Sequence, residues 1–255
     1  MTDGARPFFS VVTATRNAEK DVAILRASVV GQTEQSWEWV VQDAASTDST
    51  VRDLDAGADA RIRVDSRKDR GIYDGLNRAL RRAQGQYVLI LGADDVLAGS
   101  DVLKCLRREI ERATSPFDVL LCAAEVSPGR IFRSSLGLKT LITNTVHHQG
   151  AVYAASEFAD FSFDVSVPVV ADYEHSLRLF LQRSRARTSE LLISRCGDEG
   201  VSRRTSERML YADMHRLRTK YLPRGLSKLL MLIGSANVAR RRLEHRLRPA
   251  TGAGA

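Results

Sequence analysis

The stretch VLILGADD, which runs from Val88 to Asp95, decides the fold of this chain. It opens with four large apolar residues in succession, the pattern of a strand that is buried on both faces of a parallel sheet. A glycine, an alanine and two adjacent carboxylates, Asp94 and Asp95, follow directly. Ligands of open α/β sheets bind just beyond the carboxyl ends of such strands. We therefore expect a binding site at this position.

Two adjacent acids at such an edge need a partner if they are shielded from water. A divalent cation such as Mg²⁺ is one candidate, because it binds one or two protein carboxylates and completes its shell with substrate phosphates. The alternative is a turn that ends the strand, since Asp is a common turn former. The Asp94–Asp95 pair alone does not decide between a cation site and a turn. The rest of the chain has to decide it.

Alternating strand and helix patterns surround this stretch. We expect strands at residues 8–15, 37–42, 62–65 and 87–91, and helices at residues 17–31, 74–83 and after Ser100. This order predicts an α/β fold, in which a mainly parallel sheet is flanked by helices. After Pro116 the pattern changes to short strands at residues 118–124, 130–133, 150–153 and 191–194, a helix at 172–182 and a mostly helical region at 205–246.

The composition is that of an ordinary globular protein, with 44% apolar and 27% charged residues among 255. The three cysteines form no CxxC pair, which argues against a disulfide framework or structural zinc and favours a reducing compartment. The N-terminus has no apolar run typical of a signal peptide, and no segment reaches the roughly 18 apolar residues of a spanning helix. We therefore expect a cytoplasmic protein.

The net charge is +7. Acids and bases are mixed over the first 100 residues and no nucleic-acid-binding motif is present, so we expect no nucleic-acid partner. Residues 226–247 combine apolar residues with many arginines. Two interpretations stay open for them: an amphipathic helix in peripheral contact with an anionic membrane, or a helix packed on the rest of the protein with a solvated basic face.

Polar residues recur at the predicted strand ends, and a glycine-punctuated loop at residues 69–77 leads into a helix. Backbone amides at glycine turns and helix starts favour anionic groups. Each polar residue also has a local explanation, such as a turn or a helix cap. Their recurrence at one edge of one sheet makes a shared site the better interpretation.

Four motifs follow one another along the chain and together cover roughly residues 8–185: SVVTATRN, VVQDAASTDST, DRGIYDGLNRALRRAQGQYVLILGADD and VADYEHSLR. In this order they resemble the motifs of inverting glycosyltransferase family 2, in its bacterial branch that builds polysaccharides and glycolipids. The resemblance implies the GT-A fold, a nucleotide-diphosphate sugar as donor, and Mn²⁺ or Mg²⁺ as cofactor.

The resemblance also implies roles for individual residues. Asp94 matches the first acid of the family's pair, near ribose and metal, and Asp95 matches the metal ligand that bridges to the diphosphate. Asp43 is similar to the acid that bonds the nucleobase. The remaining residues implied on the nucleotide-sugar side are Thr13, Thr15, Asn17, Asp69, Gly71 and Asn77.

Asp172, in the motif ADYE, matches the family's catalytic base. A carboxylate there can remove the proton of an acceptor hydroxyl that attacks opposite the diphosphate, while a metal neutralises charge on the leaving group. Asp172 also opens a predicted helix, so an N-terminal cap is the alternative. Glu174 is the weaker candidate for the base.

The chain departs from the family pattern at two positions. Asp43 is followed by Ala44 where the family often has glycine, and Arg67 stands where the donor loop often carries an acid. The first change indicates a slightly different loop if that glycine needed positive φ or close approach. Arg67 could contact phosphate or indicate an altered donor preference. Neither change removes a catalytic group.

Two further segments have weaker assignments. His148 and Gln149 match a His-Gln on the acceptor side, with a structural histidine bonded to the backbone as the alternative. The segment at residues 197–204 resembles a late glycine-serine loop that would close over the diphosphate and exclude water, with a solvated loop as the alternative. Its candidate lid residues are Gly200, Ser202 and Arg203.

The sequence thus predicts an inverting glycosyltransferase that moves a sugar to a hydroxyl of a glycan or glycolipid acceptor. A non-catalytic nucleotide-sugar-binding protein and a polyprenyl-phosphate glycosyltransferase are the alternatives. We expect a GT-A domain over residues 1–204 and a helical basic extension with a flexible tail over residues 205–255. Within the domain, the nucleotide-binding half spans about residues 8–115 and the acceptor half about 116–204.

Overall fold

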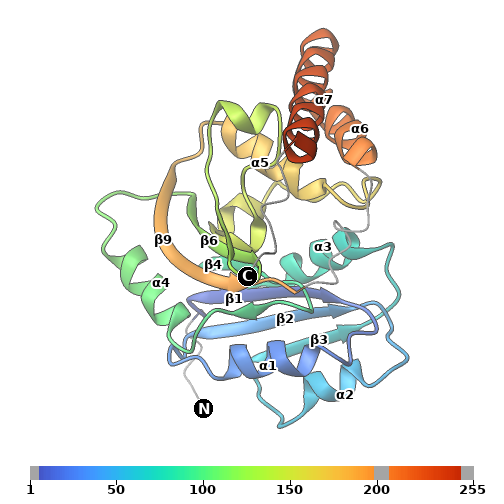
Figure 1. The fold of residues 1–255 in the computed structure, drawn as a ribbon. Helices are drawn as coiled ribbons and strands as arrows, with labels where there is room; N and C mark the ends of the chain where they lie inside the picture. The colour runs from blue at the N-terminus through green and yellow to red at the C-terminus, as the bar shows by residue number, and fades with distance from the viewer. Residues whose placement is uncertain (1–5, 198–206, 248–255) are drawn as a thin grey trace, which may run out of the picture.

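The structure is a computed structural model that describes residues 6–197 and 207–247. It has one mixed sheet with helices on both faces, which confirms the α/β fold class (Figure 1). The strand order is β3-β2-β1-β4-β8-β6-β9-β5, and β7 pairs with β6 outside this path. This arrangement brings the ends of β1, β2 and β4 to the same edge of the sheet.

Four parallel strands form the N-terminal half of the sheet. They are β1 (Phe9–Thr15), β2 (Trp37–Asp43), β3 (Ile62–Ser66) and β4 (Tyr87–Ile90). β1 lies between β2 and β4 and pairs in parallel with both, and β3 pairs in parallel with β2. All seven residues of β1 are buried, as the continuous apolar pattern of a two-sided strand requires.

The second half of the sheet is mixed. Its strands are β5 (Val96–Leu97), β6 (Val119–Ser127), β7 (Arg130–Arg133), β8 (Ala151–Ala154) and β9 (Ala186–Arg195). β8 is antiparallel to both β4 and β6, whereas β9 is parallel to β6. The parallel pairing predicted from the sequence therefore dominates only the first half. The two residues of β5 are too few to carry a periodic signal, and the sequence did not reveal them.

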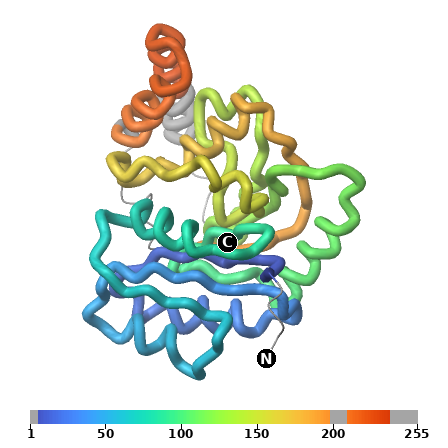
Figure 2. Tube along the Cα trace, turned by 180° about the vertical axis from the view of Figure 1, so that it is seen from behind, coloured from blue at the N-terminus to red at the C-terminus, as the bar shows by residue number. Residues whose placement is uncertain are grey.

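Successive side chains of β1 point to opposite faces of the sheet and enter two different cores. Phe9 and Val11 pack with α1 (Val22–Val30), α2 (Thr50–Asp55) and α4 (Val102–Glu111). Val12 and Ala14 pack with α3 (Ile72–Arg82), α5 (Ala171–Leu181) and α6 (Glu207–Arg218). The two groups of helices lie on opposite sides of the sheet, as the views from front and back show (Figures 1 and 2).

The first helix begins later than its predicted start at residue 17. Asn17 has a φ of 48°, which is left-handed backbone that Asn tolerates better than most residues. Its Oδ1 accepts a hydrogen bond from the Thr47 amide at 3.0 Å, and its own amide donates to Ser46 Oγ at 2.8 Å. Asn17 therefore ties the loop after β1 to the loop after β2, and α1 starts only at Val22.

Three short 3₁₀ helices complete the acceptor half: η1 (Leu138–Leu141), η2 (His148–Gly150) and η3 (Ala155–Phe158). The last helix, α7 (Arg224–Leu247), projects from the body next to α6 (Figure 1). Among the described residues, no helix is both long and apolar enough to cross a membrane.

The C-terminal helices are docked through α6. Met214 and Leu217 of α6 are buried in the core that α3 and α5 share. Arg218 is fully buried as well, and its Nη1 donates to the carbonyls of Leu141 and Ile142. The predicted boundary at residue 204 therefore does not separate two cores, and the division of the chain at that point stays a proposal.

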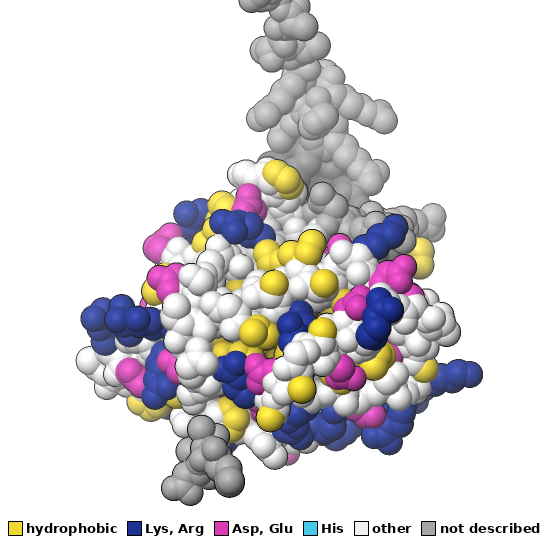
Figure 3. Space-filling model, turned by 90° about the horizontal axis from the view of Figure 1, so that it is seen from below, with side chains coloured by type: hydrophobic (Ala, Val, Ile, Leu, Met, Phe, Trp, Pro, Cys, Tyr) yellow, Lys and Arg dark blue, Asp and Glu magenta, His cyan; other side chains and the backbone are white. Residues whose placement is uncertain are grey.

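Charges of both signs are mixed on the face of the molecule that is seen from below. Lys and Arg side chains lie along its rim and across its middle, with Asp and Glu between them (Figure 3). Salt bridges such as Arg61–Asp59 and Arg67–Asp65 pair some of these charges.

Candidate active site

Two adjoining pockets lie beyond the ends of β1 and β4. The larger, with a volume of about 510 Å³, we name the Thr15 pocket. The smaller, of about 270 Å³, we name the Asp172 pocket. Both are within or near the size range of small-molecule sites. Four residues line both pockets and so mark their junction: Ala14, Ile72, Gly92 and Asp94.

The Thr15 pocket is built from the end of β1, the loop before α3 and the turn after β4. Gly71 precedes α3 with a φ of 116°, a conformation that favours glycine, and its amide donates to Asp69 Oδ1 at 3.0 Å. The guanidinium-bearing residues Arg16 and Arg70 line the same pocket. Thr15 Oγ1 is buried and has no hydrogen-bond partner. The walls therefore offer cations and an unused hydroxyl to a polar, anionic ligand.

The turn after β4 holds the two predicted carboxylates in different ways. Asp94 lines both pockets, whereas Asp95 is 2% exposed and lines neither. Backbone amides of Gly92 and Gly197 donate to the two oxygens of Asp95. A Cβ on Gly197 would lie 2.5 Å from Asp94 Oδ2, so only glycine allows the chain after β9 to pass so close. Asp94 is thus presented to the pockets, and Asp95 is fixed behind it.

The electrostatics of this pair fit a bound cation. Burial and the charge of neighbouring Asp94 raise the pKa of Asp95, and hydrogen bonds from Gly92 and Gln149 only partly offset the rise. In the described ranges neither carboxylate forms an ion pair with Lys or Arg. Two adjacent acids without such a partner suit a hard divalent ion, although those ranges hold no group of three or more His, Cys, Asp or Glu able to bind a metal.

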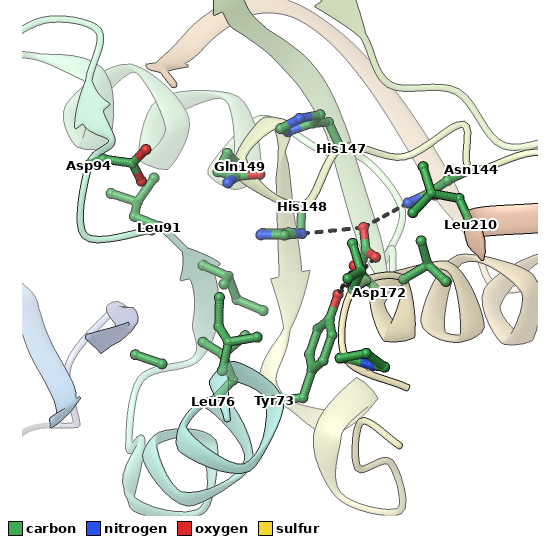
Figure 4. Close-up of a pocket in the computed structure, with 17 residues that line it drawn as sticks. Tyr73, Leu76, Leu91, Asp94, Asn144, His147, His148, Gln149, Asp172 and Leu210 are labelled. Carbon is green, nitrogen blue, oxygen red and sulfur yellow. Dashed lines mark hydrogen bonds and ion pairs between the residues drawn. The ribbon is translucent and has the colours of Figure 1, made fainter. Parts of the chain in front are cut away.

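The Asp172 pocket brings together α3, α5, η2 and the loop before α5 (Figure 4). Asp172 Oδ2 accepts a hydrogen bond from Asn144 Nδ2 at 2.7 Å. The Tyr73 hydroxyl, which donates to the Val169 carbonyl at 2.6 Å, lies 3.2 Å from Asp172 Oδ1. His148 Nδ1 lies 3.5 Å from the same carboxylate. Burial alone would raise the pKa of Asp172, but the hydrogen bond from His148 and, when that ring is protonated, its positive charge bring the pKa below its ordinary value.

The rest of the Asp172 pocket is largely apolar. One wall is Ile72 and Leu76 of α3, and Leu210 of α6 lies across from them. The segment Pro168–Val170 closes the side next to Asp172. The pocket therefore combines one ionisable cluster with a hydrocarbon surface, which suits a hydroxyl carried by a partly apolar molecule.

The predicted acceptor-side residues His148 and Gln149 both line the Asp172 pocket. Among the residues predicted on the nucleotide side, four line the Thr15 pocket: Thr15, Asp69, Gly71 and Asp94. Four others lie outside both pockets: Thr13, Asn17, Asp43 and Asn77. Asp95 joins this second group, and its role as a metal ligand stays a prediction. The lid candidates Gly200, Ser202 and Arg203 lie outside the described residues.

The four residues outside the pockets have structural partners instead. Thr13 Oγ1 accepts from the Trp39 indole at 3.0 Å inside the sheet. Asp43 is fully buried and accepts from the Ser46 amide, the Ser46 hydroxyl and the Ser66 hydroxyl. Its predicted contact with a nucleobase stays a prediction, since the carboxylate has no exposed surface here.

Asn77 connects the two halves of the molecule. Its Nδ2 donates to the Phe163 carbonyl at 2.9 Å, and its Oδ1 accepts from the Phe163 amide at 2.8 Å. The side chain thus points into the segment that leads to α5, and its predicted support of the donor loop stays a prediction.

Sequence reasoning missed Asn144, Tyr73 and Leu210 as members of the site. Asn144 and Leu210 come from parts of the chain whose patterns carry no chemical motif, and only the fold brings them to Asp172. Tyr73 stands inside a quoted motif, and its place one residue after the start of α3, two after Gly71, could have indicated that it faces the same cleft. Arg16 follows a predicted strand and Arg70 lies in the glycine-punctuated loop, so the sequence contained a signal that places both residues near the site.

The sequence model of the family described as "Glycosyl transferase family 2" matches residues 10–139, more than half of the chain. The chain belongs to glycosyltransferase family 2. It is 28% identical over 184 residues to a PGL/p-HBAD biosynthesis glycosyltransferase of Mycobacterium bovis, a match that covers 69% of this chain and 71% of the relative.

Solved structures show the same fold for this family 2 glycosyltransferase. S. aureus TarS 1-349, solved with UDP-GlcNAc, has a TM-score of 0.70 at 21% identity, over 89% of this chain and 71% of that one. The chain spans 42% of a longer TarS structure. The mannosyltransferase PcManGT of Pyrobaculum calidifontis, solved with GDP-Man and Mn²⁺, has a TM-score of 0.59 at 17% identity, over 93% and 76% of the two chains.

Proposed function

We propose that this glycosyltransferase moves a sugar, with inversion, from a nucleotide-diphosphate sugar to a hydroxyl in the Asp172 pocket. The observation that carries the proposal is the junction of the two pockets at Asp94. A donor in the Thr15 pocket would place its diphosphate and sugar next to Asp94, and an acceptor in the other pocket would approach from the opposite side. Single displacement with inversion needs that opposition.

The Thr15 pocket is proposed as the donor site. Arg16 and Arg70 would face the diphosphate, while Asp69 and the amide-rich start of α3 at Gly71 would order the loop around it. Structural relatives were solved with a UDP-sugar and a GDP-sugar, which supports a nucleotide-diphosphate sugar as the class of donor.

A divalent metal, Mn²⁺ or Mg²⁺, fits the carboxylate pair. Asp94 would bind it from the pocket side, and Asp95, the predicted ligand, stands directly behind. When bound, such an ion supplies positive charge that stabilises the departing diphosphate. The structural relative that contains Mn²⁺ supports this proposal. The chain's own contribution is to hold Asp95 through the amides of Gly92 and Gly197, which fixes where Asp94 points.

Asp172 is proposed as the carboxylate that drives removal of the acceptor's proton. It is the acid that lines the Asp172 pocket opposite Asp94. Glu174, the weaker candidate, bonds to Lys220 and Tyr221 instead and does not line the pocket. A helix cap alone would not account for three side chains converging on Asp172.

The acceptor is proposed to be a glycolipid or a glycan with an apolar portion, because Ile72, Leu76 and Leu210 line the pocket next to Asp172. Peripheral contact with an anionic membrane is part of the same proposal. The outward face of α7 carries four exposed apolar residues, Leu226, Leu229, Leu232 and Ile233. The basic side chains of Arg224 and Lys228 are exposed beside them.

The proposal is tested by thermal unfolding with UDP-, GDP- and TDP-sugars, each with and without Mn²⁺. A ligand that binds only the folded state raises the unfolding temperature. We expect one nucleotide to stabilise the protein, more strongly with Mn²⁺, and the same donor to support sugar transfer to a lipid-linked hydroxyl. No stabilisation by any donor, with or without metal, would refute the assignment of the Thr15 pocket.

A further inference from the structure

A histidine stands between Asp172 and the middle of the Asp172 pocket. His148 Nδ1 lies 3.5 Å from Asp172 Oδ2, and 21% of the His148 side chain is exposed. An ionised carboxylate only accepts hydrogen bonds, so Nδ1 carries the proton in this contact. The lone pair of the neutral ring is then on Nε2. That edge of the ring faces the side of the pocket where Leu91 and Asp94 lie (Figure 4).

Asp172 itself is less available than the ring. Asn144 Nδ2 donates to its Oδ2 at 2.7 Å, and His148 Nδ1 lies 3.5 Å from the same oxygen. The Tyr73 hydroxyl, whose proton goes to the Val169 carbonyl at 2.6 Å, packs 3.2 Å from Oδ1. Donors that already hold a carboxylate lower its tendency to take another proton. Of the two groups, the imidazole therefore presents the freer lone pair to a substrate.

The ring is also held in place. Its helix η2 is fixed by a bond from Ser194 Oγ to the Gln149 carbonyl at 2.6 Å. The His147 ring stacks beside it at 5.9 Å between centroids. Asn144 ties the preceding loop to Asp172 and accepts from the Val146 amide at 3.3 Å. A catalytic group gains from such support, because little reorganisation is then needed during the reaction.

We infer that His148 Nε2 takes the proton of the acceptor hydroxyl, and that Asp172 positions the ring and stabilises its charged form. This inference rests on the proposed function. In the step, the acceptor oxygen forms a bond to the anomeric carbon, and the bond from that carbon to the diphosphate oxygen breaks. Its electron pair leaves with the nucleoside diphosphate. The proton moves to Nε2, and solvent receives it when the product departs.

The experiment uses the full chain and four variants: His148→Ala, His148→Gln, Asp172→Asn and, as a matched control, His215→Gln. His215 lies on α6, outside the site, with Nδ1 2.8 Å from Ser227 Oγ. Donor binding by calorimetry establishes that each variant is folded. Sugar transfer is then measured with and without added imidazole and a series of substituted imidazoles.

We expect kcat of both His148 variants to fall by about 10²–10⁴-fold, the usual effect of removing a positioned base. Added imidazole should restore part of the rate to His148→Ala, more for more basic imidazoles. It should restore none to Asp172→Asn, which keeps its own ring. His215→Gln should transfer sugar at the normal rate, with no response to imidazole.

Two results would overturn the inference while leaving the proposed function intact. One is transfer by both His148 variants within about threefold of the unaltered protein, which would make Asp172 the direct base. The other is a large loss in His148→Ala that no imidazole restores, which would make His148 a structural or acceptor-binding residue. An unaltered protein that binds no nucleotide sugar and transfers none would overturn both proposals together.

Discussion

At the scale of single residues, Asp172 shows how neighbours set the use of one carboxyl group. Asn144, Tyr73 and His148 come from three different elements and surround it with donors. Burial would otherwise favour the protonated acid. These donors keep the carboxylate ionised. An ionised carboxylate at the wall of an apolar pocket can attract or orient a group that carries a proton.

Asp172→Asn tests this role. The amide keeps the size of the side chain but neither accepts a proton nor stabilises a charged histidine. We expect kcat to fall by about 10²–10⁴-fold, with donor affinity unchanged because Asp172 does not line the Thr15 pocket. Calorimetry and steady-state transfer rates measure the two effects. Glu174→Gln is the control, and normal kcat in the Asp172 variant with a large loss in the control would move the base to Glu174.

Asp94 and Asp95 are expected to respond differently to the same substitution. Asp94→Asn should abolish stabilisation of the donor complex by Mn²⁺ without lowering the stability of the free protein. Asp95→Asn should also lower stability, by about 1–3 kcal/mol, because its amide nitrogen cannot accept from the backbone amides that now bond both oxygens. Thermal unfolding with and without Mn²⁺ separates the two.

Chelation tests the metal itself. EDTA should abolish turnover of the unaltered protein, and Mn²⁺ or Mg²⁺ should restore it. Full activity in metal-free buffer would contradict the assignment of the pair.

Individual residues also show how much of the candidate site could be predicted from the sequence. Asp69, Gly71, Asp94 and Asp172 belong to local motifs, and the structure places each at a pocket wall. Asp43, in contrast, belongs to an equally clear motif but is enclosed by Ser46 and Ser66. Which face of a loop turns inward depends on its tertiary partners, and the sequence pattern does not encode those partners.

At the scale of elements, α5 carries a histidine in the core. His175 is enclosed by aromatic rings, with the Phe161 ring 4.4 Å away between centroids, and its Nε2 has no hydrogen-bond partner. Burial lowers the pKa of His175 to about 3. The helix is therefore anchored by a neutral imidazole that acts as an aromatic ring.

This burial predicts an acid sensitivity. Unfolded histidine has a pKa of about 6.5, so between pH 6.5 and 3 the unfolded chain binds a proton that the folded chain does not. The free energy of unfolding should therefore decrease as the pH is lowered through this range. This group contributes a decrease of up to about 1.4 kcal/mol per pH unit. His175→Phe should remove that part of the slope.

Denaturant titrations at pH 7 and pH 4.5 measure the effect, with His215→Gln as the control. Equal slopes in His175→Phe and the unaltered protein would show that another group is responsible.

The elements themselves were largely predictable where their pattern was periodic. The four N-terminal strands and α3 lie within a few residues of their expected positions, because buried parallel strands and amphipathic helices have strong repeats. The start of α1 was wrong, since the left-handed turn at Asn17 depends on a contact with the next loop. The mixed pairing of the second half was also out of reach, because short strands do not reveal their direction.

At the scale of the whole molecule, α7 has two faces. Ser227, Leu230 and Gly234 face inward, and a Cβ on Gly234 would come within 2.6 Å of the Tyr211 ring. Leucines at positions 226, 229 and 232 face outward. An exposed apolar face on a docked helix is typical of a surface that binds a partner.

An anionic membrane is the partner we expect. Replacing Leu226, Leu229 and Leu232 by serine should reduce sedimentation with anionic liposomes, without lowering stability, because all three side chains are exposed. The matched control is Leu138→Ser, at an exposed leucine on η1. Deletion of residues 226–255 should reduce binding further, since each basic group near such a surface contributes about 1 kcal/mol. A protein that ignores liposomes at low salt would contradict the idea.

The position of α3 has a consequence for engineering and for divergence within the family. Its start at Gly71 borders the Thr15 pocket, Tyr73 and Leu76 border the Asp172 pocket, and Asn77 clasps the segment that leads to α5. This single helix thus sets the spacing between the proposed donor and acceptor. Suppose that the segment from Phe163 to Asp172 is replaced by that of a relative while Asn77 and the rest of α3 are kept. The bonds between the two would then change, the spacing would shift, and use of the donor would be disturbed as well. Recombined variants should work best when α3 and the segment from Phe163 to Asp172 are inherited as one block.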